Sequence, residues 1–213
     1  MADPLNYAVI QDFLIGLVPP REQEMQLMEE YGRKTDFPII GPAAGYACYQ
    51  ITRLIKAKSV FEMGSGYGYS TAWFARGVKE NGGGVVHHVV WDEKLSKLAS
   101  GHLSRLGYDG IIQYHMAEAV ATLRETPGPF DLIFCDIEKQ DYPAALPVIK
   151  GKLRPAGVLI IDNILWSGRI FDKADGSAAT QGVREFTRLI TADPDWIVSL
   201  VPVRDGMIVA YKK

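Results

Sequence analysis

Three oxygen-bearing side chains that could hold a hard cation follow two apolar runs in the second half of the chain. Asp136 comes directly after the run at 130–135, and Asp162 and Asn163 follow the run at 157–161. If both runs are neighbouring parallel strands, their carboxyl ends meet at one edge of a sheet and the three side chains converge there. Two carboxylates and an amide oxygen suit Mg²⁺, or alternatively Mn²⁺ or Ca²⁺. Each position alone also fits a helix cap or a turn.

A lysine and a tryptophan stand close to these acids in the sequence. Lys139 comes three residues after Asp136, and Trp166 follows Asn163. A lysine beside a cation and away from water can have a lowered pKa and act as a base, although spacing alone favours an ordinary solvated lysine. A tryptophan offers a flat apolar face to an aromatic molecule, although a core or subunit contact explains Trp166 equally well.

A glycine-rich segment from Glu62 to Gly68 follows the apolar run at 59–63. Glycine permits positive φ and close approach of the backbone to a ligand, and the amides of a following helix can bind a carboxylate. A phosphate loop would need Gly-Lys-Ser/Thr, which is absent, and a dinucleotide loop would have glycine where Tyr69 stands. An acid before the first glycine suits a loop that binds a nucleoside joined to an amino acid. A plain strand-to-helix turn is the alternative.

Two further positions are expected beside the sugar and the base of such a nucleoside. Asp92 ends the predicted strand at 85–91, where an acid can accept hydrogen bonds from ribose hydroxyls. It can also cap the next helix, and the two roles are compatible. Ala117-Glu118-Ala119 follows the third predicted strand. Its small residues leave room for adenine, and Glu118 can face the amino group, although a simple helix start explains the segment on local grounds.

The elements that must position these residues alternate along the chain. Short apolar runs bounded by turn residues predict strands at 59–63, 85–91, 111–115, 130–135 and 157–161. Periodic apolar positions predict helices at 69–78, 93–106, 118–124, 142–152 and 183–191. This alternation predicts an α/β fold, with a parallel sheet covered by helices on both faces.

The two ends of the chain depart from this alternation. Asp205-Gly206, between apolar runs at 196–203 and 207–211, predicts a hairpin, so the sheet should end in an antiparallel pair. Before the first strand, helices are expected at 7–17, from about 25 to 32, and from Pro42 to about Ala57. We therefore expect seven strands, mostly parallel, with the last strand antiparallel.

Length and composition limit the class of protein. The 213 residues, 47% hydrophobic and 23% charged, suit one domain at 1–213, with N-terminal helices at 1–40 and a core at 41–213. The net charge of −2 disfavours a general nucleic-acid binder. The two cysteines form no CxxC pair, which disfavours a disulfide framework or a zinc knuckle. Residues 1–20 lack a signal-peptide pattern, and no apolar stretch approaches the ~20 residues of a membrane span, so we expect a cytoplasmic protein without a membrane partner.

Three motifs together resemble those of the cation-dependent O-methyltransferases, the group that contains catechol and caffeoyl-CoA O-methyltransferases, and its bacterial members above all. The motifs are residues 61–70 around the glycine loop, Asp136-x-x-Lys139-x-x-Tyr142, and Asp162-Asn163-x-Leu165-Trp166. The resemblance covers the chain from about Gly41 onward. It implies a Rossmann-like class I methyltransferase fold, S-adenosylmethionine as methyl donor, a divalent cation, an aromatic acceptor with vicinal hydroxyls, and a homodimer.

The resemblance also implies a role for each matching residue. Lys139 matches the catalytic base, acting with Asp136. The metal ligands match Asp136, Asp162 and Asn163. Contacts with the methyl donor match Ile40, Glu62, Gly64, Ser65, Ser70, Asp92, Ala119 and Asp136. Among these, the backbone of Ile40 and the hydroxyl of Ser70 would meet the methionine end, and Asp92 is chosen over Glu93 for the ribose.

Two other functions remain as alternatives at this point. An NAD-dependent oxidoreductase would use the same glycine loop, but it lacks the third glycine of that motif and leaves Asp136, Asp162 and Asn163 unexplained. A non-catalytic nucleoside-binding protein would explain the fold, but it gives no reason to retain Lys139 with these three residues.

Overall fold

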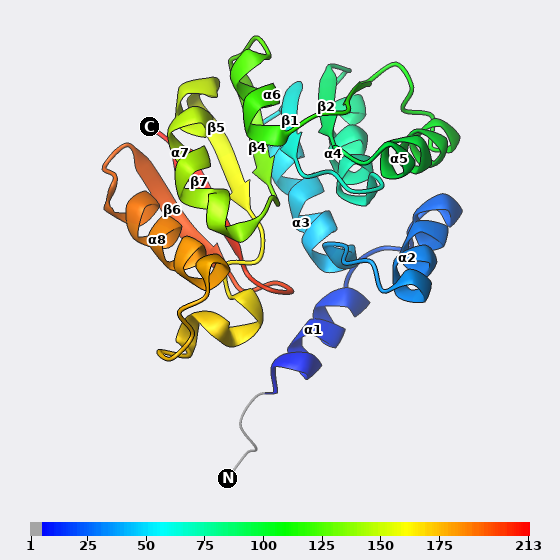
Figure 1. Ribbon diagram of the computed structural model, residues 1–213. Coiled ribbons are helices and arrows are strands. Elements are labelled where there is room, and N and C mark those ends of the chain that lie inside the picture. Colours follow the sequence, from blue (N-terminus) through cyan, green and yellow to red (C-terminus); the bar gives the residue numbers. More distant parts are fainter. Residues whose placement is uncertain (1–5) are drawn as a thin grey trace.

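The computed structural model describes residues 6–213 and contains one mixed sheet of seven strands (Figure 1). Across the sheet the order is β3-β2-β1-β4-β5-β7-β6. The strands are β1 (Ser59–Met63), β2 (Val85–Val89), β3 (Ile112–His115), β4 (Phe130–Cys135), β5 (Leu153–Ile161), β6 (Trp196–Val201) and β7 (Met207–Lys212). Residues 1–5, part of the segment in which we expected no signal peptide, lie outside the described residues.

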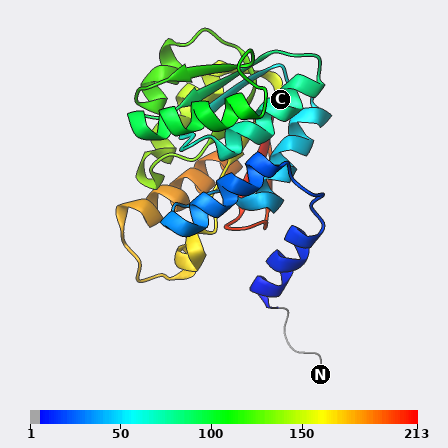
Figure 2. The ribbon, with the colours of Figure 1, turned by 90° about the vertical axis from the view of Figure 1, so that its right-hand side faces the viewer.

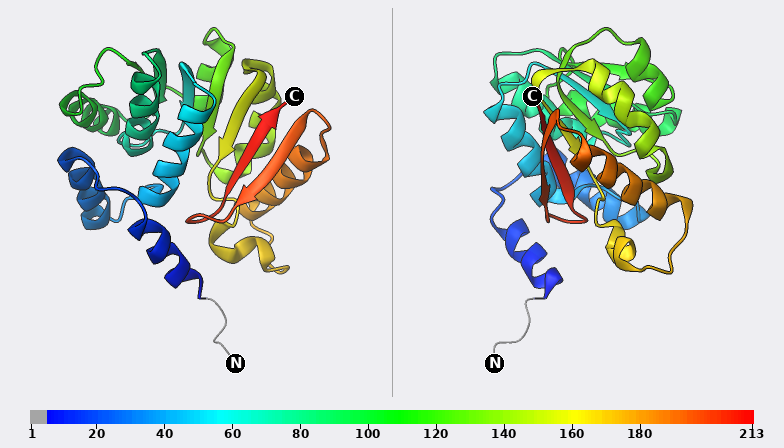
Figure 3. Two further views of the ribbon diagram at one scale, coloured as in Figure 1. Left: turned by 180° about the vertical axis from the view of Figure 1, so that it is seen from behind. Right: turned by 90° about the vertical axis from the view of Figure 1, so that its left-hand side faces the viewer.

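The direction of the strands confirms the predicted fold class. Pairs β1·β2, β1·β4, β2·β3 and β4·β5 are parallel, whereas β7 is antiparallel to both β5 and β6. The reversed strand is the last in the chain, and it lies between β5 and β6, so the predicted antiparallel pair forms one border of the sheet (Figure 3).

Helices cover both faces of the sheet, and alternate residues of each strand enter two separate cores. Val60 faces the core beneath α2, α3, α4 and α5, whereas Phe61 and Met63 face the core beneath α6, α7 and α8. The eight helices found in residues 6–213 are α1 (Tyr7–Gly16), α2 (Gln23–Thr35), α3 (Gly41–Leu54), α4 (Tyr69–Glu80), α5 (Glu93–Arg105), α6 (Ala119–Glu125), α7 (Tyr142–Lys152) and α8 (Ala178–Ala192). None of these helices is both long and apolar enough to cross a membrane.

The boundaries of several elements differ from the predictions. The last strand pair is joined by a turn at 202–206, so the first strand of the pair is shorter than the predicted 196–203. Helices α2 and α8 begin earlier than predicted, α8 because Ser177 accepts a hydrogen bond from Thr180 N and caps the helix. Two short 3-10 helices, η1 (Lys139–Asp141) and η2 (Trp166–Phe171), were not predicted.

The first helix has little contact with the body. No residue of α1, from 7 to 16, is buried, and Phe13 is 65% exposed. Figure 2 shows α1 standing away from the sheet. Its polar side chains hold the β6–β7 turn, since the Tyr7 hydroxyl donates to the carbonyl of Arg204, and Gln11 Oε1 accepts from Arg204 N at 2.6 Å. The predicted helix is confirmed, but its apolar stripe does not enter the core of this chain.

Candidate functional site

A cavity of about 650 Å³ opens at the carboxyl ends of the parallel strands. Its wall takes residues from the segments that follow β1 to β5 and from the β6–β7 turn, among them Gly64, Val90, Ala119, Asp136, Asn163 and Arg204. This is the edge where open α/β sheets bind ligands. The glycine loop, Asp136 and Asn163 therefore border one cleft, whereas the predicted third member of the acidic cluster, Asp162, is buried and does not line it.

The glycine loop is held between the two neighbouring strands. Gly64 has φ +85°, and a Cβ there would lie 2.2 Å from the carbonyl oxygen of Asp136, so only glycine fits. Ser65 ties the other side to β2, because its amide donates to Val89 O at 2.9 Å and its hydroxyl accepts from Val89 N at 2.9 Å. Both Gly64 and Ser65 line the cavity, as expected for contacts with a bound nucleoside.

The methionine end of the predicted donor site is formed by the starts of two helices. Ser70 lies in the first turn of α4, and Ile40 immediately precedes α3; both line the cavity. The first amides of a helix have no partner within the helix, so the start of α4 offers donors to a carboxylate.

Glu62 stands behind the glycine loop and does not line the cavity. It is fully buried in β1, where Oε2 accepts from the Thr71 hydroxyl, and that hydroxyl also contacts His88 Nδ1 at 2.9 Å. Oε1 has no hydrogen-bond partner among the described residues. Burial raises the pKa of Glu62 to about 7, opposed by the hydrogen bond from Thr71. The structure therefore gives Glu62 a place in a buried network, and its predicted contact with the donor stays a prediction.

At the nucleoside end, the helix-capping alternatives are observed. Asp92 is exposed, accepts from Leu95 N at 3.0 Å as the N-cap of α5, and does not line the cavity. Glu118 caps α6 through both oxygens, which accept from the amides of Val120 and Ala121. Ala119 lines the cavity as predicted.

The end of β2 contributes an apolar wall that sequence reasoning missed. Val90 and Trp91 line the cavity, and Trp91 is 76% exposed. A tryptophan at the carboxyl end of a predicted strand, where open α/β sheets bind ligands, was the signal available in the sequence.

Lys139 is not a solvated surface lysine. The residue is 9% exposed, and Nζ donates to Asp136 Oδ1 at 2.6 Å and to the carbonyl of Ile137 at 3.1 Å. The aromatic rings of Tyr142 and Trp166 lie 5.3 and 5.7 Å from Nζ. The amine therefore sits at the cavity wall, between a carboxylate and two apolar surfaces.

Asp162 is fully buried behind Asn163. Its Oδ2 accepts from Arg204 Nη1 at 3.1 Å, while Oδ1 has no hydrogen-bond partner in the described part of the chain. Burial, and then the charge of Asp136, raise the pKa of Asp162 above its ordinary value, opposed by the charge of Arg204. The Asn163 side chain donates from Nδ2 to Asp205 Oδ2 at 3.2 Å, and within residues 6–213 no hydrogen bond is made to its amide oxygen, which can serve as a ligand.

These residues fit a divalent cation by their donor atoms. Within residues 6–213, no group of three or more His, Cys, Asp or Glu side chains is placed to hold a metal ion. The candidate set instead combines two carboxylates with the amide of Asn163, and its buried Asp162 Oδ1 lacks a partner among those residues. Such oxygen donors suit a hard cation that keeps some water ligands. Both carboxylates already carry an ion pair, from Lys139 and from Arg204.

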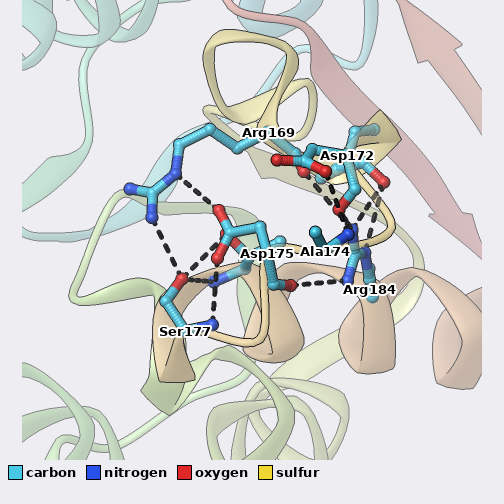
Figure 4. A network of polar contacts seen from close by, with 8 residues as sticks. Arg169, Asp172, Ala174, Asp175, Ser177 and Arg184 are labelled. Atoms are coloured by element: carbon cyan, nitrogen blue, oxygen red, sulfur yellow. Dashed lines mark hydrogen bonds and ion pairs between the residues drawn. The ribbon is translucent and has the colours of Figure 1, made fainter.

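The segment after Asn163 is fixed by two anchors. Trp166, Ser167 and Gly168 all have positive φ, and Asp205 Oδ1 accepts from Ser167 N at 2.6 Å. Further along, Arg184 of α8 donates to the carbonyls of Ile170, Asp172 and Asp175, and Arg169 pairs with Asp175 (Figure 4). These contacts hold Trp166 at the cavity wall.

The β6–β7 turn is the second part of the site that sequence reasoning missed. Arg204-Asp205-Gly206 was interpreted only as a hairpin signal, yet Arg204 reaches Asp162 and Asp205 orients Asn163. The acidic and basic character of these turn residues was the available signal.

Comparisons with known proteins agree with this geometry. A family model described as O-methyltransferase matches residues 25–213. The chain is 30% identical over 183 residues to a catechol O-methyltransferase of Niastella koreensis, covering 82% of each chain. It resembles the structure of an O-methyltransferase from Bacillus cereus in complex with SAH, with a TM-score of 0.86, 26% identity, and coverage of 96% of this chain and 97% of that one. TomG from Streptomyces achromogenes, an O-methyltransferase of tomaymycin synthesis in complex with SAM, has a TM-score of 0.85, 23% identity and 96% coverage of each chain, and at that identity shows the fold alone.

Proposed function

The chain belongs to the O-methyltransferase family, and from that premise we propose that it transfers a methyl group from S-adenosylmethionine to a metal-chelated hydroxyl of a catechol-like or caffeoyl-type small molecule. One observation carries the proposal. The glycine loop, the Lys139–Asp136 pair and Asn163 line the same cavity, so a donor and an acceptor can lie together within reach of a base and of oxygen ligands.

The donor is assigned to the part of the cavity between the glycine loop and the end of β2. Gly64 and Ser65 bring backbone close to it, and Ser70 with the start of α4 supplies hydrogen-bond donors for its carboxylate. Val90 and Trp91 give its nucleoside an apolar wall. When bound, S-adenosylmethionine supplies a methyl group that is already activated as a sulfonium. The similar O-methyltransferase from Bacillus cereus, whose structure is in complex with SAH, supports this assignment.

The acceptor is assigned to the other end of the cavity, beside Trp166 and Asn163. The ring of Trp166 offers a flat surface to an aromatic acceptor. Holding the acceptor oxygen in line with the methyl group can contribute roughly 7–11 kcal/mol to catalysis. The protein's part is therefore mainly alignment, together with removal of one proton.

Lys139 is assigned as the base that removes this proton. In its neutral form, Nζ can accept the proton of the acceptor hydroxyl, while Asp136 Oδ1, 2.6 Å away, holds the amine in place. Tyr142 and Trp166 keep water from the amine. Asp136, Asp162 and Asn163 would hold the divalent cation, and when bound it supplies Lewis-acid stabilisation of the ionised hydroxyl.

The test is a pair of measurements on the full chain. Calorimetry with S-adenosylmethionine and with NAD should detect binding of the first only. Mass spectrometry of reactions with catechol, caffeate and a flavonoid, with Mg²⁺ present, should detect a product heavier by one methyl group. NAD binding without S-adenosylmethionine binding would overturn the proposal in favour of an oxidoreductase. Donor binding without transfer to any hydroxylated aromatic would favour a non-catalytic protein.

A further inference from the structure

Arg204 is a cationic residue of the β6–β7 turn that reaches the candidate cation site from outside. Its Nη1 lies 3.1 Å from Asp162 Oδ2, with the arginine side chain 30% exposed and the carboxylate fully buried. The backbone of Arg204 is held by α1, because Gln11 Oε1 accepts from its amide and the Tyr7 hydroxyl donates to its carbonyl. The contacts from α1 therefore fix Arg204 in position beside Asp162.

The charge balance at Asp162 depends on this arginine. A buried carboxylate is costly unless a positive partner compensates it. Lys139 already pairs with Asp136, and Arg204 is the side chain that pairs with Asp162, whose other oxygen has no hydrogen-bond partner among residues 6–213. Each carboxylate of the candidate site is therefore already paired with a positive side chain, Asp136 with Lys139 and Asp162 with Arg204. These side chains supply the positive charge that a divalent cation would otherwise supply.

We propose that Arg204 is a resident counter-charge that competes with the divalent cation for Asp162 and so sets the metal affinity of the site; this inference rests on the cation site of the proposed function. The guanidinium and a doubly charged ion repel each other at short range, and Asp162 Oδ2 cannot bond fully to both. Arg204 also lines a second cavity of about 660 Å³, together with Tyr7 and Gln11, into which its side chain can turn. Metal binding therefore displaces the Arg204 side chain from Asp162.

The experiment compares the binding of Mn²⁺ alone to the chelator-treated full chain, measured from the free-ion electron paramagnetic resonance signal. Arg204→Met keeps much of the side-chain length and removes the charge. It should bind Mn²⁺ at least about tenfold more tightly than the wild type, because one repelling charge is gone. Arg188→Met is the matched control, since Arg188 is an exposed residue of α8 that pairs with Glu185, and its affinity should equal that of the wild type. Arg204→Lys should fall between the wild type and Arg204→Met.

A second measurement guards against a folding defect in Arg204→Met. Because a ligand that binds only the folded state stabilises it, Mn²⁺ should raise the Tm of Arg204→Met more than that of the wild type. Equal or weaker Mn²⁺ binding by Arg204→Met, with an equal or smaller rise in Tm, overturns the competition while the cation site stands. Absence of Mn²⁺ binding in the wild type and in every variant overturns the cation site of the proposed function, and this inference with it.

Discussion

Replacing Lys139 by arginine or by methionine separates the two roles that the structure gives this side chain. Lys139 is 9% exposed and its amine pairs with Asp136 at 2.6 Å, so the side chain contributes both a charge and the proposed base. An arginine keeps the positive charge beside Asp136 but stays protonated in proteins and cannot accept a proton. Methionine removes both properties and keeps much of the apolar volume between Tyr142 and Trp166.

The expected magnitudes follow from these two roles. A positioned base contributes about 10²–10⁴-fold to the rate, so kcat should fall by that factor in both variants, with little change in the KM of the acceptor. Only Lys139→Met should lose stability, by about 1–3 kcal/mol, because Asp136 then lacks its partner while it keeps partial contact with water.

The assay measures kcat and KM with catechol and Mg²⁺, and urea unfolding measures stability. Calorimetry with S-adenosylmethionine serves as the control, since donor binding should survive in both variants. If Lys139→Arg keeps kcat within about threefold of the wild type, Lys139 is not the base. Its role would then be structural only, through the ion pair with Asp136 that an arginine can also make.

Three further predictions concern residues around the cavity. Asp205→Ala removes the hydrogen-bond acceptor of the Asn163 side chain and of the Ser167 backbone amide. Mn²⁺ affinity should therefore fall about tenfold, while S-adenosylmethionine affinity stays unchanged. An unchanged Mn²⁺ affinity would show that Asp205 does not orient Asn163 as a metal ligand. Gly64→Ala places a Cβ 2.2 Å from the carbonyl oxygen of Asp136, whereas a Cβ at Gly82, which also has positive φ, meets nothing within 4 Å. Gly64→Ala should therefore lower Tm more than Gly82→Ala. Equal losses of Tm would mean that the positive φ alone accounts for the cost of both substitutions. Burial raises the pKa of Glu62 from 4.5 to about 7, so between these pH values the folded state binds more protons than the unfolded state. The free energy of unfolding should therefore fall as the pH rises from 4.5 to 7, and Glu62→Gln should flatten this slope in urea unfolding. An unchanged slope in Glu62→Gln would refute the assignment.

The fold was predictable because its signals are local. The apolar runs at 59–63 and 130–135 predicted two central strands of the sheet. The glycine loop after the first of these strands indicated where the cleft lies. Asp205-Gly206 gave the reversed last strand. The extent of α2, and the two 3-10 helices, depend on caps and contacts made by residues far away, which the periodicity of a segment does not contain.

The site was predictable only in part, because the burial and the partners of its side chains depend on residues from distant segments of the chain. Spacing alone favoured a solvated Lys139, and it is buried since Trp166, from a later segment, covers it. Arg204 acts at Asp162 because β7 pairs with β5, a long-range contact that turn chemistry does not reveal. Trp91 lines the cavity in the place where we expected the acid Asp92 to act.

Metal-assisted methyl transfer at this cavity is tested by removing the metal from the enzyme and then returning it. The chelator-treated full chain is incubated with S-adenosylmethionine and catechol, and methylated product is measured by mass spectrometry with and without added Mg²⁺. Methylated product is expected only when Mg²⁺ is returned, and none is expected in Asp162→Ala at the same Mg²⁺ concentration. Full turnover of the chelator-treated wild type without Mg²⁺ would contradict this expectation.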